Sequence, residues 1–171
     1  MKKLLAVLMP FLFGGCLDLP EGVKPVNEFD LDRYKGKWYE IARLDHSFER
    51  GMEQVTAEYS LNDDGSVKVL NRGFKSSDQK WKDAQGKALF VGESDLAHLK
   101  VSFFGPFYGS YGVFELGDDY EYSFVSGSNT KYLWFLSRTP AVSDSLKKHF
   151  VSKVEELGFP AEELIWVKQG E

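Results

Sequence analysis

The residues able to do chemistry in this chain are few and do not form a catalytic set. Cys16 is the only cysteine, which excludes an internal disulfide. The three histidines, His46, His98 and His149, lack the spacing of a metal site or of a nucleophile with its base, and no Gly-x-Ser-x-Gly motif is present. The sequence therefore predicts no catalysis, no metal and no cofactor, and it directs attention to Cys16.

The stretch before Cys16 has the pattern of a secretory signal peptide. A basic start is followed by an apolar run over residues 4–13 and by two glycines. This run is about half of the roughly 20 apolar residues that a spanning helix needs. We expect residues 1–15 to be cleaved, residues 16–27 with their prolines to form a lipidated tether, and residues 28–171 to form one domain.

Residues 12–16, Leu-Phe-Gly-Gly-Cys, resemble the bacterial lipobox, in which the cysteine thiol is diacylated and becomes the new N-terminus. Phe13 departs from the usual aliphatic residue of that motif. The resemblance implies a lipid anchor at Cys16, and Leu17, which is not aspartate, implies sorting to the outer membrane, with the protein facing the periplasm. The alternative is an unmodified secreted protein with a free thiol.

Composition limits the choice of partners. With 43% hydrophobic and 15% aromatic residues the chain can fill a single core. The net charge is −5, and loss of Lys2 and Lys3 with the signal peptide makes it −7, which disfavours nucleic acid as a partner.

Short segments rich in β-branched and aromatic residues, separated by Gly, Asp, Asn and Ser, extend to about residue 137 and indicate an antiparallel barrel or sandwich. The clearest strand is 55–61, and a turn with Gly65 leads into a returning strand from Val67. Further strands are expected at 37–44, 80–91, 97–104, 110–116, 119–126 and 131–138. These make an all-β fold of eight strands, enough to close a barrel around side chains or one small ligand.

One helix is expected after the strands. Ser143 is a suitable N-cap, apolar residues recur at helical spacing, and Gly158 ends the run. This helix should pack its apolar stripe on the outside of the barrel, and residues 164–167 should add a short strand. On the first strand, alternation from Trp38 leaves two possibilities at Glu40 and Ile41: a β-bulge or burial on both faces.

Two separated motifs resemble those of the lipocalins. Gly36-x-Trp38 is similar to the opening strand of that family, and residues 136–140, with Arg138, are similar to its closing motif. In that family the arginine packs over the tryptophan and closes one end of an up-and-down barrel. Residues 119–122 partly match the middle motif, and residues 45–51, 100–108 and 132–134 are similar to bacterial outer-membrane lipocalins, relatives of apolipoprotein D.

The resemblance implies a fatty acid or lysophospholipid ligand in the barrel. Trp134 shares a face with Arg138 and should point into the cavity. The expected lining is aromatic: Trp134, Tyr108, Phe104, Phe90 and Tyr59, each of which could instead fill a packed core. The candidates for binding a head group, which could equally be solvated, are basic residues near predicted loops: Arg43, His46, Arg50 and Lys75.

We therefore expect an outer-membrane lipocalin that stores or transports lipids and supports envelope maintenance. One alternative is an envelope interaction protein with a filled barrel, in which Phe107 or Tyr111 could build a homodimer face. Another is a lipid-modifying enzyme. Catalysis by a cysteine inside the barrel is excluded, because the only cysteine lies at the tether.

Overall fold

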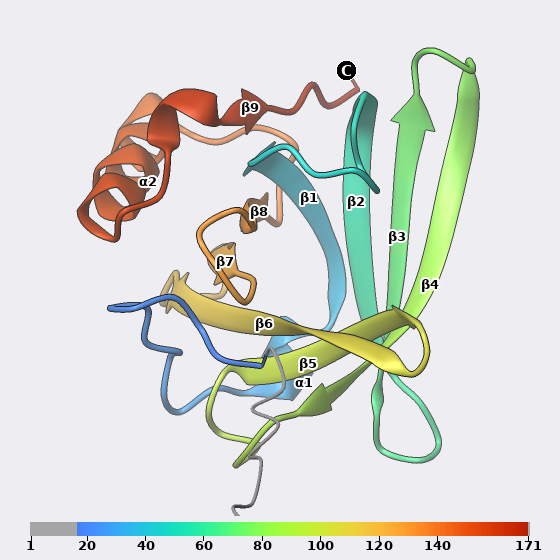
Figure 1. The fold of residues 1–171 in the computed structure, drawn as a ribbon, viewed down its shortest axis with the longest axis vertical. Helices are drawn as coiled ribbons and strands as arrows, with labels where there is room; N and C mark the ends of the chain where they lie inside the picture. The colour runs from blue at the N-terminus through green and yellow to red at the C-terminus, as the bar shows by residue number, and fades with distance from the viewer. Residues whose placement is uncertain (1–16, 171) are drawn as a thin grey trace, which may run out of the picture.

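A computed structural model describes residues 17–170, so the predicted signal peptide and Cys16 lie outside the described residues. Its sheet runs in the order β2-β3-β4-β5-β6-β7-β8-β1 and closes because β1 pairs with both β8 and β2. The strands are β1 (Gly36–Arg43), β2 (Met52–Leu61), β3 (Val67–Lys75), β4 (Lys80–Phe90), β5 (His98–Phe104), β6 (Phe107–Leu116), β7 (Tyr122–Ser126) and β8 (Leu133–Ser137). The predicted eight-stranded antiparallel barrel is confirmed (Figure 1).

The alternating strands give the barrel two different ends. The loops after β1, β3, β5 and β7 lie at one end, which we call the open end, and those after β2, β4 and β6 lie at the other, the closed end. The short helix α1 (Leu31–Tyr34), which the sequence did not reveal, lies at the closed end (Figure 1). Asp30 caps it by accepting a hydrogen bond from the backbone N–H of Asp32.

The largest differences from the predicted strand boundaries are at the starts of β2, β6 and β7, and β6 begins at Phe107 rather than at residue 110. β7 begins at Tyr122 rather than at residue 119, because residues 117–121 form a turn in which the N–H of Tyr120 donates to the carbonyl of Gly117. β2 begins earlier than residue 55, at Met52, since its first residues pair with the end of β3. The predicted turn at Gly65 is present, and its φ of 81° is one that glycine adopts without strain.

The structure resolves the two possibilities on β1 in favour of a bulge. The register with β8 shifts between Glu40 and Ala42. Ile41 and Ala42 therefore pack in the cluster outside the barrel, whereas Glu40 and Arg43 are buried within it. One extra residue thus places two charged side chains in the interior.

The second helix, α2 (Asp144–Glu156), covers the outside of the barrel as predicted. Ser143 is its N-cap, and Gly158 follows its end with a φ of 80°. Phe150 and Val154 are completely buried, and the Phe150 ring lies 4.7 Å from that of Phe124 on β7. A 3₁₀ turn over Ala161–Glu163 leads to β9 (Ile165–Trp166), which pairs with β1. Within residues 17–170 no helix is long and apolar enough to cross a membrane.

Residues 17–27, expected to be part of a tether, are packed against the barrel from Leu17 onward. Val26 donates to the backbone carbonyl of Val113 at 2.8 Å and accepts from the backbone of Ala97 at 2.9 Å. A Cβ on Gly112 would lie 2.6 Å from Leu19, so this glycine lets Leu19 approach the β6 backbone. The described part of the tether is therefore integrated into the domain.

The closed end is sealed by the two motif residues. The guanidinium carbon of Arg138 lies 3.8 Å from the ring centroid of Trp38, which is fully buried. Arg138 also donates hydrogen bonds to the backbone carbonyls of Lys37, Arg33 and Tyr34. The stacking implied by the family resemblance is present, and it connects α1 to β1.

Replacing Arg138 with alanine should lower the free energy of unfolding by about 2 to 3 kcal/mol, because several backbone carbonyls lose their donor together with the stacking contact. Urea denaturation of the form lacking residues 1–16 measures this. Arg72→Ala is the matched control: Arg72 also lies over a tryptophan, Trp81, at 4.7 Å, but is 48% exposed. It should cost less than about 1 kcal/mol, and equal losses for both variants would contradict a special role for Arg138.

Candidate ligand-binding site

The interior next to the closed end is almost filled. Its enclosed cavity has a volume of only about 10 Å³, room for roughly one water molecule. The walls are aromatic and aliphatic side chains from α1, the segment before it and five strands: Phe29, Leu31, Tyr34, Tyr59, Val67, Ala88, Leu99, Val101 and Tyr111. This region is a hydrophobic core with no space for an acyl chain.

Three tyrosine hydroxyls form a polar layer above this floor. The hydroxyl of Tyr111 lies 2.8 Å from that of Tyr34 and 2.8 Å from that of Tyr59, and Tyr34 also contacts the Ser123 hydroxyl at 2.9 Å. Burial raises the pKa of Tyr34 to about 12. The hydroxyls therefore stay neutral and satisfy one another. Tyr111, which the sequence suggested for a homodimer face, instead contributes to this interior layer.

The barrel is open above the tyrosine layer, along β4. Alternation from the buried Ala88 makes Gly86, Ala84 and Lys82 the interior positions of this strand. Gly86 is partly exposed, and Ala84 and Lys82 are exposed, so solvent reaches the interior at their height. β5 pairs only with residues 87–90 of β4, which leaves the upper part of β4 joined to β3 alone.

A buried charged network lines the opposite wall, next to the open end. Arg43 Nη1 donates to Oε1 of Glu40 at 2.8 Å, and its Nη2 donates to the backbone carbonyl of Glu49. The indole N–H of Trp134 donates to Oε2 of Glu49 at 3.1 Å. His46 Nε2 lies 2.7 Å from the same oxygen without the alignment of a hydrogen bond. This network holds the loop after β1 against the barrel.

The two carboxyl groups in this network have different proton affinities. Burial, together with the negative charge of Glu49, raises the pKa of Glu40 well above 4.5, and Arg43 only partly offsets this. Burial alone would also raise the pKa of Glu49. The close contact with His46, the hydrogen bond from Trp134 and the charge of Arg43 together lower it. The network therefore favours an ionised Glu49 beside a Glu40 that binds its proton tightly.

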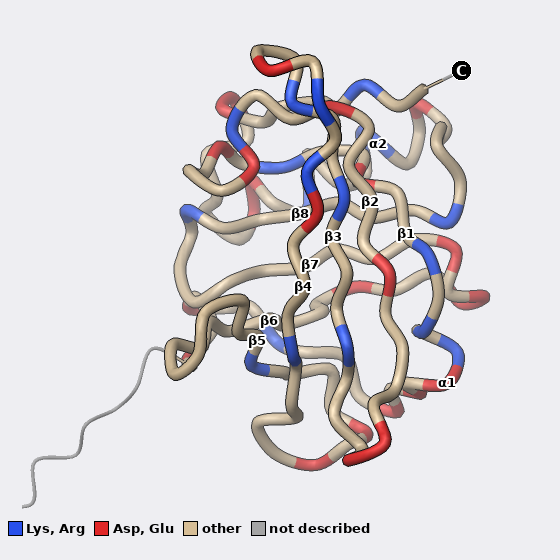
Figure 2. Tube along the Cα trace, turned by 90° about the vertical axis from the view of Figure 1, so that its right-hand side faces the viewer, with Lys and Arg blue, Asp and Glu red and all other residues tan. Residues whose placement is uncertain are grey.

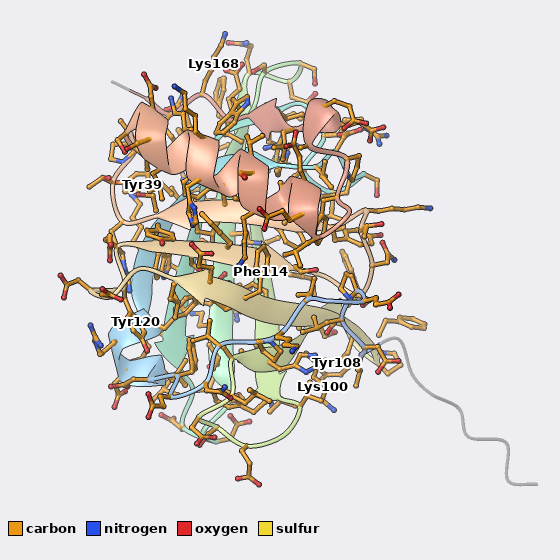
Figure 3. All side chains as sticks on the ribbon, turned by 90° about the vertical axis from the view of Figure 1, so that its left-hand side faces the viewer. Tyr39, Lys100, Tyr108, Phe114, Tyr120 and Lys168 are labelled. Carbon is orange, nitrogen blue, oxygen red and sulfur yellow. The ribbon has the colours of Figure 1, made fainter. Side chains whose placement is uncertain are left out.

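The structure brings three of the five predicted lining residues to the interior. Tyr59 is buried there, and Phe90 and Trp134 pack partly buried against the same cluster. Phe104 and Tyr108 do not line it, which corrects their prediction: Phe104 is 80% exposed at the end of β5, and Tyr108 lies on the outer face beside Lys100 (Figure 3).

Two aromatic residues that the sequence reasoning missed take part in the interior instead. Phe103 packs against the interior cluster and lies over Gly86, and Tyr111 joins the tyrosine layer. The register between β5 and β6 shifts between Val101 and Phe104. Alternation along β5 nevertheless continues through Phe103: Leu99 and Val101 line the interior cavity, and Phe103 shares their face, so the strand pattern could have identified it.

The four basic candidates for a head group separate into two pairs. Arg43 and His46 are 1% and 5% exposed and belong to the buried network, so the expectation that they lie free at a loop is wrong. Arg50 is exposed and paired with Asp45 at 2.8 Å, and Lys75 donates to the backbone carbonyl of Arg50. Only this second pair is accessible to a ligand at the open end.

The remaining charges are mixed in sign. In Figure 2 blue and red segments follow one another along β3 and β4, where Arg72 pairs with Asp83 and Lys87 with Asp64. Among residues 17–170 no three His, Cys, Asp or Glu side chains are grouped so that they could hold a metal ion.

A closed antiparallel barrel with an apolar floor, and with interior positions of β4 exposed near one end, has the architecture of a small-molecule-binding protein. Comparison with known proteins gives the family. A lipocalin-like domain matches residues 29–169, and the chain belongs to this family.

Similar proteins agree with this assignment. The chain is 55% identical over 170 residues to the outer membrane lipoprotein Blc of Vibrio cholerae, covering 99% of each chain. It is 51% identical over 150 residues to the protein of that name in Escherichia coli K12, covering 88% of this chain and 85% of the relative. Insecticyanin from Manduca sexta, at 20% identity and a TM-score of 0.70 over 90% of this chain and 88% of its own, shows the same fold.

Glu40 should give the stability an unusual pH dependence. Its pKa is raised in the folded state, so between 4.5 and that raised value the folded protein binds more protons than the unfolded chain, and stability falls as pH rises. Glu40→Gln removes this loss. The variant should therefore gain stability relative to the wild type as the pH rises above 4.5.

Urea denaturation at a series of pH values tests this expectation. Glu58→Gln, which removes a carboxylate from the exposed face of β2, is the matched control. A constant difference between Glu40→Gln and the wild type across the range would mean that Glu40 does not bind its proton more tightly on folding.

Proposed function

We propose that this protein is a lipid-anchored lipocalin of the outer membrane that holds a fatty acid or lysophospholipid in its barrel. The observation that carries the proposal is the difference between the two ends: the closed end is sealed by Arg138 and Trp38 over a filled floor, whereas interior positions of β4 are exposed above the tyrosine layer. A compartment of this kind, which we call the cup, suits a molecule with one apolar and one polar end.

The acyl chain is assigned to the upper half of the barrel. The floor is too full to admit it, whereas Phe103 and Trp134 offer apolar surface above. Each buried methylene contributes about 0.8 kcal/mol, so even a partly enclosed chain is held. A phosphate or carboxylate head group would meet Arg50 and Lys75 at the open end.

The proposed location rests on residues outside the described range and on the relatives. The lipobox-like sequence ending in Cys16 supplies the anchor, and the two Blc proteins are named outer membrane lipoproteins. Binding, transport or storage of lipid for envelope maintenance, with the protein facing the periplasm, is the role proposed. Catalysis is not part of it, because the lipocalin-like match and the cup point to a binding protein.

Titrating the form lacking residues 1–16 with lysophospholipids and fatty acids should give saturable changes in tryptophan fluorescence, at about one ligand per barrel. Trp134→Phe should remove most of this change, because Trp134 lies inside the barrel. Trp166→Phe, on β9 outside it, should leave the change intact. An unchanged signal in Trp134→Phe would exclude this residue from the site, and an absence of binding by either lipid class would favour a filled, surface-acting barrel.

Charge reversal at the open end tests the head-group assignment. Lys75→Glu and Arg50→Glu should each weaken lysophospholipid binding by about threefold to tenfold, the range expected for losing one accessible charged contact. Lys68→Glu, on the outer face of β3 near the closed end, is the matched control. Affinities that stay the same in the first two variants would refute the assignment.

A further inference from the structure

The most exposed large apolar side chains of the described residues lie in or beside loops and turns at the open end, and two of them share one hairpin. Phe104 and Phe107, which flank the turn between β5 and β6, are 80% and 78% exposed, and Phe48 in the loop after β1 is 54% exposed. Single exposed apolar residues are common on protein surfaces, but neighbouring ones such as Phe104 and Phe107 form a patch of the kind that marks contact with a protein or a membrane. None of them takes part in the binding cup described above.

The beginning of the described chain lies beside this hairpin. Ser110, three residues after Phe107 on β6, donates a hydrogen bond to the backbone carbonyl of Leu17 at 2.9 Å. Three residues of strand span about 10 Å, and Cys16 is covalently joined to Leu17, with about 3.8 Å between their Cα atoms. Little chain is therefore available to separate an acylated Cys16 from the hairpin.

The outer face between the hairpin turn and Leu17 suits the interface of a bilayer. Lys100 Nζ lies 5.1 Å from the centre of the Tyr108 ring, and both lie together on the outside of the barrel (Figure 3). Tyrosine and lysine favour the head-group layer, whereas phenylalanine enters the acyl region. The net charge of −7 after removal of residues 1–15 disfavours broad adsorption to anionic lipids, so contact must be local and apolar.

We infer that the hairpin carrying Phe104 and Phe107 inserts into the same membrane leaflet that holds the acyl chains of Cys16. This inference rests on the proposed lipid anchor and extends it. Two attachments side by side fix the orientation of the barrel, with its open end next to the bilayer. A lipid then passes between membrane and cup without crossing bulk water.

Site-specific labelling of the full-length, acylated protein in vesicles of phosphatidylethanolamine and phosphatidylglycerol tests this orientation. Cys16 is the only cysteine, so acylation of its thiol lets an introduced cysteine react alone with a nitrobenzoxadiazole fluorophore. A label on Phe107→Cys should be blue-shifted and quenched by nitroxide-bearing phospholipids. A label on Leu61→Cys, 48% exposed at the closed end, is the matched control and should stay solvent-like and unquenched.

Solvent-like emission at both positions would overturn the inference. A second contrary outcome is a blue shift at position 107 that increases with the density of protein on the vesicles and is not accompanied by quenching from lipid nitroxides. In that case a second copy of the protein, and not the bilayer, would cover the hairpin. Labelling of the wild-type chain at Cys16 would show that the anchor is absent, which removes this part of the proposed function and the inference with it. Lipid titration of the form lacking residues 1–16 tests the cup separately.

The double variant Phe104→Ser/Phe107→Ser gives a functional readout in the same vesicles. Its uptake of a fluorescent fatty acid from the bilayer should be about tenfold slower, since burial of even one phenylalanine favours the inserted form by roughly that factor. Its affinity for the same fatty acid in solution should be unchanged. Equal uptake rates for variant and wild type would overturn the inference.

Discussion

The contact between Arg138 and Trp38 is the interaction on which the rest of the barrel depends. The guanidinium covers the indole face and donates to backbone carbonyls of β1 and α1, so one side chain holds these two elements together. An arginine suits this position because its planar group can stack and donate in several directions at once. With this end closed, the barrel has a single opening, and the two ends can serve different purposes.

One interior has to serve as both hydrophobic core and ligand compartment. The layer formed by Tyr34, Tyr59 and Tyr111 separates these two uses: the space towards the closed end is nearly filled, and the space towards the open end is accessible along β4. The buried charges of Arg43 and Glu49 would be costly if isolated, but their hydrogen bonds hold the loop after β1 in place. The loop after β1 is therefore held in place on one side of the barrel, while the upper part of β4 is exposed on the other.

Part of the candidate site follows from alternation on single strands. Trp134 could be placed in the interior because it lies four residues before Arg138 and therefore on the same face of the strand. Tyr59 could be placed there because apolar and polar residues alternate along β2. Phe103 follows from the same alternation, since Leu99 and Val101 line the interior, so the choice of Phe104 in its place was an error of phase and not the result of a hidden register shift. On β1 the phase does change, at the bulge between Glu40 and Ala42, and the local residue pattern does not reveal where a bulge occurs.

The sequence by itself determined the strand segments, the capped helix after them and the two motif residues at the closed end, because alternation, capping and glycine turns act over a few residues. Only the tertiary structure decided that Arg43 and His46 are buried with Glu40 and Glu49, and that Leu17 lies beside the β5–β6 hairpin. These neighbours come from distant parts of the chain. Their contacts depend on strand register and barrel closure, which are properties of the whole sheet.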